Sequence, residues 1–143
     1  MPKLLIFAAC EKAIISQGDS TPSLIAMFQQ INIPMKGMPE PLPEKPIVPF
    51  RWAVFAEWLF EEKEIGKHFE YRLEFKSEQE DGDAFFANAS ELHADKRIMR
   101  AIGSLEGFPL VPPGEYRLLA SIRQKGEDQW DTQGNYPVTV THI

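Results

Sequence analysis

The chain has 143 residues, of which 43% are hydrophobic and 11% aromatic, which predicts one folded domain over residues 1–143 and excludes a disordered chain. The net charge is −6, and the excess lies between Glu57 and Asp83, where ten acidic residues accompany four basic ones. Because no basic stripe could neutralise phosphates and anionic lipids would repel the chain, we expect neither a nucleic-acid nor a membrane partner.

The first apolar segment, Leu4 to Cys10, ends on the single cysteine of the sequence, so no intramolecular disulfide can form. Small residues before a cysteine also occur at bacterial lipoprotein cleavage sites. The apolar stretch before Cys10 is shorter, however, than the roughly 7–15 residues of a secretory core. We therefore favour a buried first strand with Cys10 as an inert core residue. No run approaches the roughly 18 apolar residues of a membrane span, which predicts a cytoplasmic protein.

The segment from Leu24 to Ile33 is apolar at odd and even positions alike, as is Leu4 to Cys10. Both are predicted to be strands buried on both faces, and short buried helices are the alternative. Gln17 to Ser20 supplies a turn between them.

Pro34 to Pro49 contains six of the twelve prolines. Since proline has no N–H for a sheet ladder, we expect an extended crossover between two sheets here and not a central strand. The spacing Pro43, Pro46, Pro49 also fits a ligand of SH3-type grooves. A crossover packed on its own domain is the favoured interpretation.

Two segments alternate strictly and decide the fold class. Within Lys67 to Lys76 the odd positions from Phe69 to Phe75 are all apolar and the even positions are all polar, as in a strand with one buried face. Phe50 to Phe60 alternates in the same way, but its second face, with Ala53, Phe55 and Leu59, is partly apolar. That second face suggests homo-oligomerisation.

The C-terminal half continues the pattern. Strands are expected over Ala84–Leu92, Arg97–Leu105, Glu115–Arg123 and Tyr136–Val140, with turns at Asp81–Asp83, Pro112–Gly114 and Gln133–Asn135, and a short helix is conceivable near Ala94 to Met99. The sequence thus predicts an all-β, immunoglobulin-like β-sandwich of about seven to nine strands. The predicted core residues are Trp52, Val54, Trp58, Phe69, Tyr71, Leu73, Tyr116, Leu118 and Ile122.

No catalytic, cofactor-binding or metal-binding residue is predicted. His68, His93 and His142 stand alone in the sequence, without further ligands at zinc spacing. The acidic loop Glu78 to Asp83 lacks the ligand series of an EF-hand and is interpreted as a solvated turn, like Glu61 to Glu64. No nucleophile elbow, Walker loop or zinc-protease motif is present.

Several pieces of the chain together resemble a bacterial family of uncharacterised domains of about this length. The pieces are Cys10-Glu11, the Ser23-Leu24-Ile25 segment with Phe28 and Ile31, Gly107 to Leu110, and Pro113 to Arg117. The resemblance covers nearly the whole chain and implies a β-sandwich. It supplies no activity and no site residues.

The function expected from the sequence is that of a non-catalytic binding or assembly module, acting through loops or edge strands on another protein or on a second copy. The alternative is a small-molecule binder or enzyme with a carboxylate-lined site. That alternative rests on the carboxylates between Glu57 and Asp83, beside the aromatic set Trp52, Trp58, Phe69, Tyr71 and Phe75.

Overall fold

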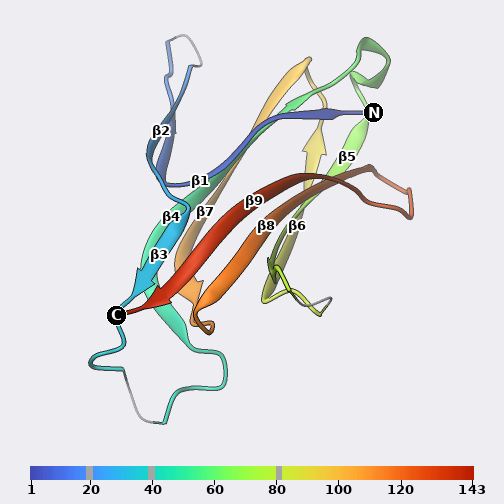
Figure 1. Cartoon of the computed structure of the whole chain (residues 1–143). Coiled ribbons are helices and arrows are strands. Elements are labelled where there is room, and N and C mark those ends of the chain that lie inside the picture. The colour runs from blue at the N-terminus through green and yellow to red at the C-terminus, as the bar shows by residue number, and fades with distance from the viewer. Residues whose placement is uncertain (19–20, 39–40, 80–81) are drawn as a thin grey trace.

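A computed structural model describes residues 1–18, 21–38, 41–79 and 82–143 and shows two sheets packed face to face (Figure 1). Sheet A has the order β2-β1-β4-β7, and sheet B has the order β3-β9-β8-β5-β6. The strands of sheet A are β1 (Lys3–Ile15), β2 (Pro22–Met27), β4 (Ile47–Leu59) and β7 (Ile98–Pro109). Those of sheet B are β3 (Gln30–Ile33), β5 (His68–Ser77), β6 (Phe86–His93), β8 (Gly114–Gln124) and β9 (Asp131–His142). The predicted all-β sandwich is confirmed.

The strand order is immunoglobulin-like. Leaving out β2 and β3, the sheets are β1-β4-β7 and β9-β8-β5-β6, which correspond to strands A-B-E and G-F-C-C′ of immunoglobulin-type domains. Tyr116, near the start of β8, donates its hydroxyl to the carbonyl oxygen of Pro112 at 2.6 Å. This is the tyrosine corner that such domains place at the start of strand F.

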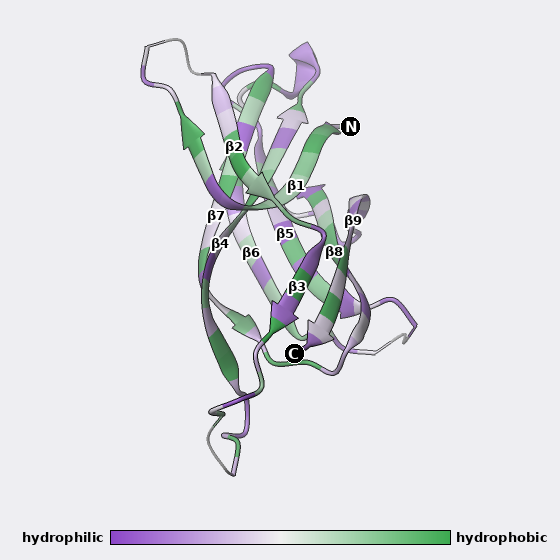
Figure 2. Cartoon of the chain, turned by 60° about the vertical axis from the view of Figure 1, so that its left-hand side comes forward, coloured by the Kyte–Doolittle hydropathy of each residue, from purple (hydrophilic) through white to green (hydrophobic). Residues whose placement is uncertain are grey.

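The core lies between the two sheets and follows the period-two pattern. All nine predicted core residues are buried, from Trp58, Leu118 and Ile122 at 0% exposure to Tyr71 at 9%. Figure 2 shows hydrophobic and hydrophilic residues alternating along the strands. Phe75 is fully buried, with its ring 5.2 Å from those of both Phe108 and Tyr116.

The prediction of one doubly buried strand from Leu24 to Ile33 is wrong. The chain forms β2 in sheet A and then changes sheets to form β3, which pairs in parallel with β9. Ala26, within β2, has a left-handed φ of 56°. β2 is an edge strand and is mostly exposed. β1 is longer than predicted, and its Leu5 and Ile6 are 43% and 41% exposed, so the double burial predicted for Leu4 to Cys10 is also wrong.

The predicted crossover is confirmed, because the proline-rich segment connects β3 of sheet B to β4 of sheet A. Residues 39 and 40 of that segment lie outside the described residues. Pro49, however, lies within β4, in the part of that strand that pairs with β7 alone, since the pairing of β4 with β1 begins at Ala53. The register between β4 and β7 shifts between Pro49 and Trp52, which is the kind of irregularity that admits a proline into a sheet.

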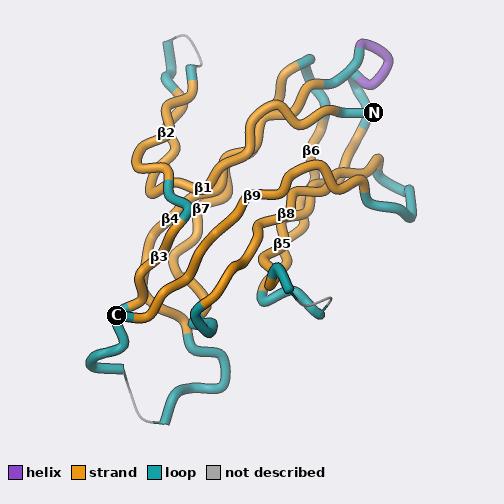
Figure 3. The backbone as a smooth tube through the Cα atoms, viewed as in Figure 1, coloured by secondary structure: helices purple, strands orange, loops and turns teal. Residues whose placement is uncertain are grey.

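The short helix considered near Ala94 to Met99 is wrong. Ala94 is fully buried and its N–H donates to the carbonyl oxygen of Lys67, while β7 begins at Ile98. Within the described ranges, the helical structure is one 3-10 turn, Glu62–Glu64, drawn in purple in Figure 3. It occupies the predicted charged turn after β4. The predicted turns at Gln17 to Ser20 and Asp81 to Asp83 fall partly on residues 19–20 and 80–81, outside the described residues.

The described part of the chain contains no helix that is long and apolar enough to cross a membrane.

Candidate functional site

The two open sides of the sandwich differ. On one side the chain passes from β2 to β3, and Phe28 fills the space between the sheets, with ring centroids 5.7 Å from Phe50 and 6.0 Å from Trp52. On the opposite side β6 and β7 are the last strands of their sheets, and each has a strand neighbour on one edge only in the described topology. This second side therefore carries two unpaired sheet edges.

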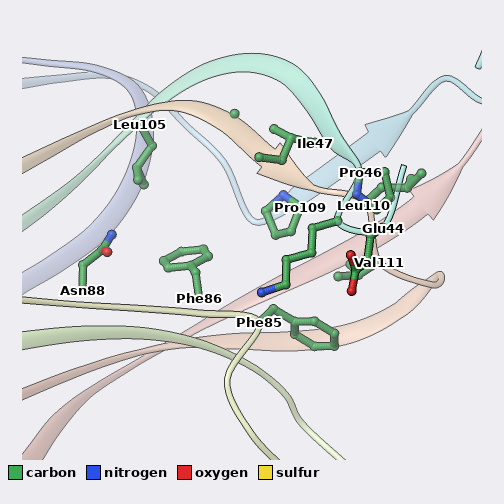
Figure 4. Close-up of a pocket in the computed structure, with 12 residues that line it drawn as sticks. Glu44, Pro46, Ile47, Phe85, Phe86, Asn88, Leu105, Pro109, Leu110 and Val111 are labelled. Carbon is green, nitrogen blue, oxygen red and sulfur yellow. The ribbon is translucent and has the colours of Figure 1, made fainter. Parts of the chain in front are cut away.

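A groove of about 420 Å³ opens at this second side (Figure 4). Its wall comes from three segments far apart in the sequence: the end of the crossover, the start of β6, and the end of β7 with the residues that follow. The lining is mainly apolar and aromatic. It consists of Glu44, Lys45, Pro46, Ile47, Phe85, Phe86, Asn88, Leu105, Gly107, Pro109, Leu110 and Val111.

The floor of the groove joins the aromatic core. Phe86 pairs with Phe75 across β5 and β6, which turns its ring toward sheet A, and the two rings stack 5.6 Å apart. Phe85 precedes the strand and remains 46% exposed. An aromatic surface that continues into a rigid core is preorganised to receive apolar groups.

Backbone contacts hold the β7 wall in place. The Leu110 N–H donates to the carbonyl oxygen of Pro46 at 3.0 Å, which fastens the end of the crossover beside the end of β7. The Trp52 indole donates to the carbonyl oxygen of Gly107 at 2.8 Å. A Cβ at position 107 would lie 2.2 Å from Cγ2 of Ile47, so only glycine lets Ile47 occupy this position. Ile47 is 67% exposed at the rim.

The β6 edge beside the groove lacks the usual protection against pairing. Residues 87–91 of β6 are exposed, and four of the five are the small or short residues Ala87, Asn88, Ala89 and Ser90. The strand contains no proline and no lysine, the residues that commonly block sheet edges. Asn88 reaches into the groove, while Glu44 and Lys45 supply charges at the crossover side. The site can therefore bind apolar side chains next to an available backbone ladder.

The carboxylates between Glu57 and Asp83 do not gather in one place. Glu57 pairs with Arg100 at 2.8 Å on sheet A, whereas Glu70 pairs with Arg123 at 3.2 Å on sheet B. Glu64 is buried, 3.4 Å from the N-terminal amine. None of the carboxylates between Glu57 and Asp83 that the structure describes lines the groove. The aromatic set beside these carboxylates in the sequence lies in the core, with Trp52, Trp58, Phe69, Tyr71 and Phe75 all buried.

The histidines include one contact that the sequence analysis missed. His68 and His93 face each other across β5 and β6, and their rings stack 4.4 Å apart. His93 also lies 2.7 Å from the carboxylate of Asp95, and His142 lies against the carbonyl oxygen of Val111 at 2.8 Å. Only the strand register would have revealed the pair. No cluster of three potential metal ligands is found among the residues that the structure describes.

The outer face of sheet A is a second apolar surface. Ala53 and Phe55 point away from sheet B, next to Cys10 and Ala8 of β1, and all four are at most 5% exposed. Their neighbours on this face are side chains of β1, β2, β4 and β7, which pair with one another in sheet A. Several of those surrounding side chains are themselves exposed: Ile6, Met27, Ile98 and Ile102.

Comparisons with known proteins leave the family open. No protein-family model matches this chain, and no curated protein matches it. The resemblance to a bacterial family of uncharacterised domains therefore stays a prediction.

Proposed function

We propose that this protein is a non-catalytic binding module that takes up an extended segment of another protein. The segment adds to β6 as a further strand of sheet B, and its alternate side chains enter the groove between β6 and β7. The observation that carries the proposal is that the apolar groove opens directly alongside an unprotected sheet edge.

Strand addition uses two sources of affinity, and the site offers both. The free edge of β6 provides main-chain donors and acceptors, which bind any extended peptide. The groove provides specificity, because every second residue of an added strand faces the same side as Phe86 and Asn88. Its lining favours apolar side chains at those alternate positions.

The groove volume also suits the recognition of a few side chains. About 420 Å³ lies within the range of sites that hold compact ligands. The alternative function, a small-molecule binder, would use the same groove for an apolar ligand. Among the described residues the groove has one lining carboxylate, Glu44, which gives no support to a carboxylate-lined catalytic site.

A peptide-display selection on the immobilised protein tests the proposal. We expect the enriched sequences to alternate apolar and variable residues. A synthetic peptide with the selected sequence should bind in calorimetry. It should also slow hydrogen exchange of those β6 amides that do not already bond to β5.

Two matched substitutions locate the site. Ile47→Glu places a charge at the groove rim and should weaken peptide binding by about tenfold or more. Ile25→Glu makes the same change at another exposed isoleucine, on β2, and should leave binding unchanged. Strand addition at β6 would be ruled out if the selected peptides showed no alternation of apolar residues. It would also be ruled out if Ile47→Glu and Ile25→Glu weakened peptide binding equally. An apolar small molecule that binds in the groove when no peptide does would favour the alternative.

A further inference from the structure

β7 forms the other free edge of the open side, and its sequence is self-complementary. It runs from Ile98 to Pro109, and no proline or lysine precedes Pro109. Ala101, Gly103 and Ser104 lie in its middle, and a Cβ added at Gly103 would meet no atom within 4 Å. The charged residues of the strand are Arg100 and Glu106, three positions on either side of Gly103.

We propose that two copies of this protein associate through β7, antiparallel and related by a twofold axis at Gly103. In a continuous sheet, residues opposite each other share a face, so a strand that pairs with its own copy must be centred on a residue and not between two. Centring on Gly103 places Arg100 of each copy opposite Glu106 of the other. A twofold interface requires this kind of self-complementarity.

The two charged groups suit this role. The Glu106 side chain is 85% exposed and lies 4.0 Å from Arg51, an equally exposed partner. Arg100 is 26% exposed and donates to Glu57 through Nε at 2.8 Å. A guanidinium has five N–H donors in a planar fork, so it can serve carboxylates on two sides.

The same pairing would extend the apolar surface of sheet A. Ile98 and Ile102, on the outer side of β7, are 40% and 37% exposed. Joining β7 to its copy makes one sheet of eight strands and brings the two outer faces together as a continuous surface. Exposed apolar surface of this kind marks interaction sites on soluble domains. β7 also carries the groove-lining residues Leu105, Gly107 and Pro109, so the second copy and the peptide of the proposed function would share the open side between β6 and β7.

Charge-reversal variants test the dimer by light scattering after size exclusion, over a range of concentrations. The wild-type chain should show a concentration-dependent dimer. Glu106→Arg places like charges opposite each other twice and should raise the dimer dissociation constant by about tenfold or more. Arg100→Glu should do the same. An equimolar mixture of the two variants should form a heterodimer, because each Arg then faces a Glu again.

The controls separate this interface from others. Glu127→Arg, an exposed charge reversal in the β8–β9 connection, should leave the dimer unchanged. If Arg100→Glu fails to fold after losing Glu57, Glu106→Arg alone still decides the outcome. The inference would be overturned if the chain stayed monomeric at every concentration, or if Glu106→Arg left the dimer dissociation constant unchanged. Glu106 does not line the groove, so peptide binding by Glu106→Arg tests the proposed function independently.

Discussion

The hydroxyl of Tyr116 donates a 2.6 Å hydrogen bond to the carbonyl oxygen of Pro112, four residues earlier. The bond closes the corner at which the chain leaves β7 of sheet A and enters β8 of sheet B. Tyr116 is 5% exposed, and its ring stacks on Phe75 at 5.2 Å. One side chain thus fixes both the turn and the core beneath it.

Tyr116→Phe should lower the free energy of unfolding by about 1–2 kcal/mol, because the ring contacts remain while the Pro112 carbonyl loses its donor. Urea denaturation followed by fluorescence measures the change. The slope of the transition should stay the same, since the fold and the surface exposed on unfolding are unchanged. A variant as stable as the wild type would show that the corner bond contributes nothing.

The two core tryptophans should respond differently to replacement by phenylalanine. Both are buried, but the Trp52 indole donates to Gly107, whereas the Trp58 indole nitrogen has no hydrogen-bond partner within the described ranges. Trp52→Phe leaves the Gly107 carbonyl without its donor. Trp58→Phe instead removes an indole N–H that has no acceptor within the described ranges. We expect Trp52→Phe to cost about 1–2 kcal/mol more than Trp58→Phe in parallel urea titrations. Equal losses would mean that cavity formation dominates at both sites.

Gly134→Ala should destabilise the sandwich by about 1–3 kcal/mol through overpacking. A Cβ at position 134 would lie 2.7 Å from the Cβ of Ala120 and 2.8 Å from the ring of Phe7. Gly103→Ala is the matched strand control, with no atom near its Cβ. It should leave the melting temperature of the monomer nearly unchanged or raise it slightly. Similar losses at the two positions would point to backbone effects and not to packing.

Stability should fall at alkaline pH in part through Cys10. Burial raises the pKa of its thiol above the usual value. Above about pH 8.5–9 the unfolded chain therefore loses a proton that the folded chain keeps, and rising pH favours unfolding. The stability difference between wild type and Cys10→Ala should be constant near pH 7 and shrink from pH 9 upward. Urea midpoints at several pH values measure it, and a difference independent of pH would contradict the burial effect.

The sequence correctly predicted the strands that have one buried face and one solvent-exposed face. Phe69 to Phe75 alternates with charged residues, so its period is visible without any partner strand. From Leu24 to Ile33 both faces looked apolar, and the change of sheet between β2 and β3 left no signature in composition. The exposed isoleucines of β1 and β2 were also unpredictable, since an apolar residue on an outer face reads like one in the core.

The groove could not be predicted either. Its walls come from Ile47, Phe86 and Leu105, which lie in three segments that the sequence does not connect. Each is an apolar residue in or beside a strand and is indistinguishable from a core residue by pattern alone. The exposed edge of β6 depends on strand order, which alternation does not specify. The stacked His68 and His93 depend on register in the same way.

The parallel pairing of β3 with β9 has a consequence for biosynthesis. β3 is synthesised early, yet its partners, Thr139 to His142, belong to β9, the last strand of the domain. The nascent chain can form hairpins before β9 emerges, but the edge of sheet B that contains β3 can pair only after β9 has been synthesised. This edge of the sandwich is therefore the last to form.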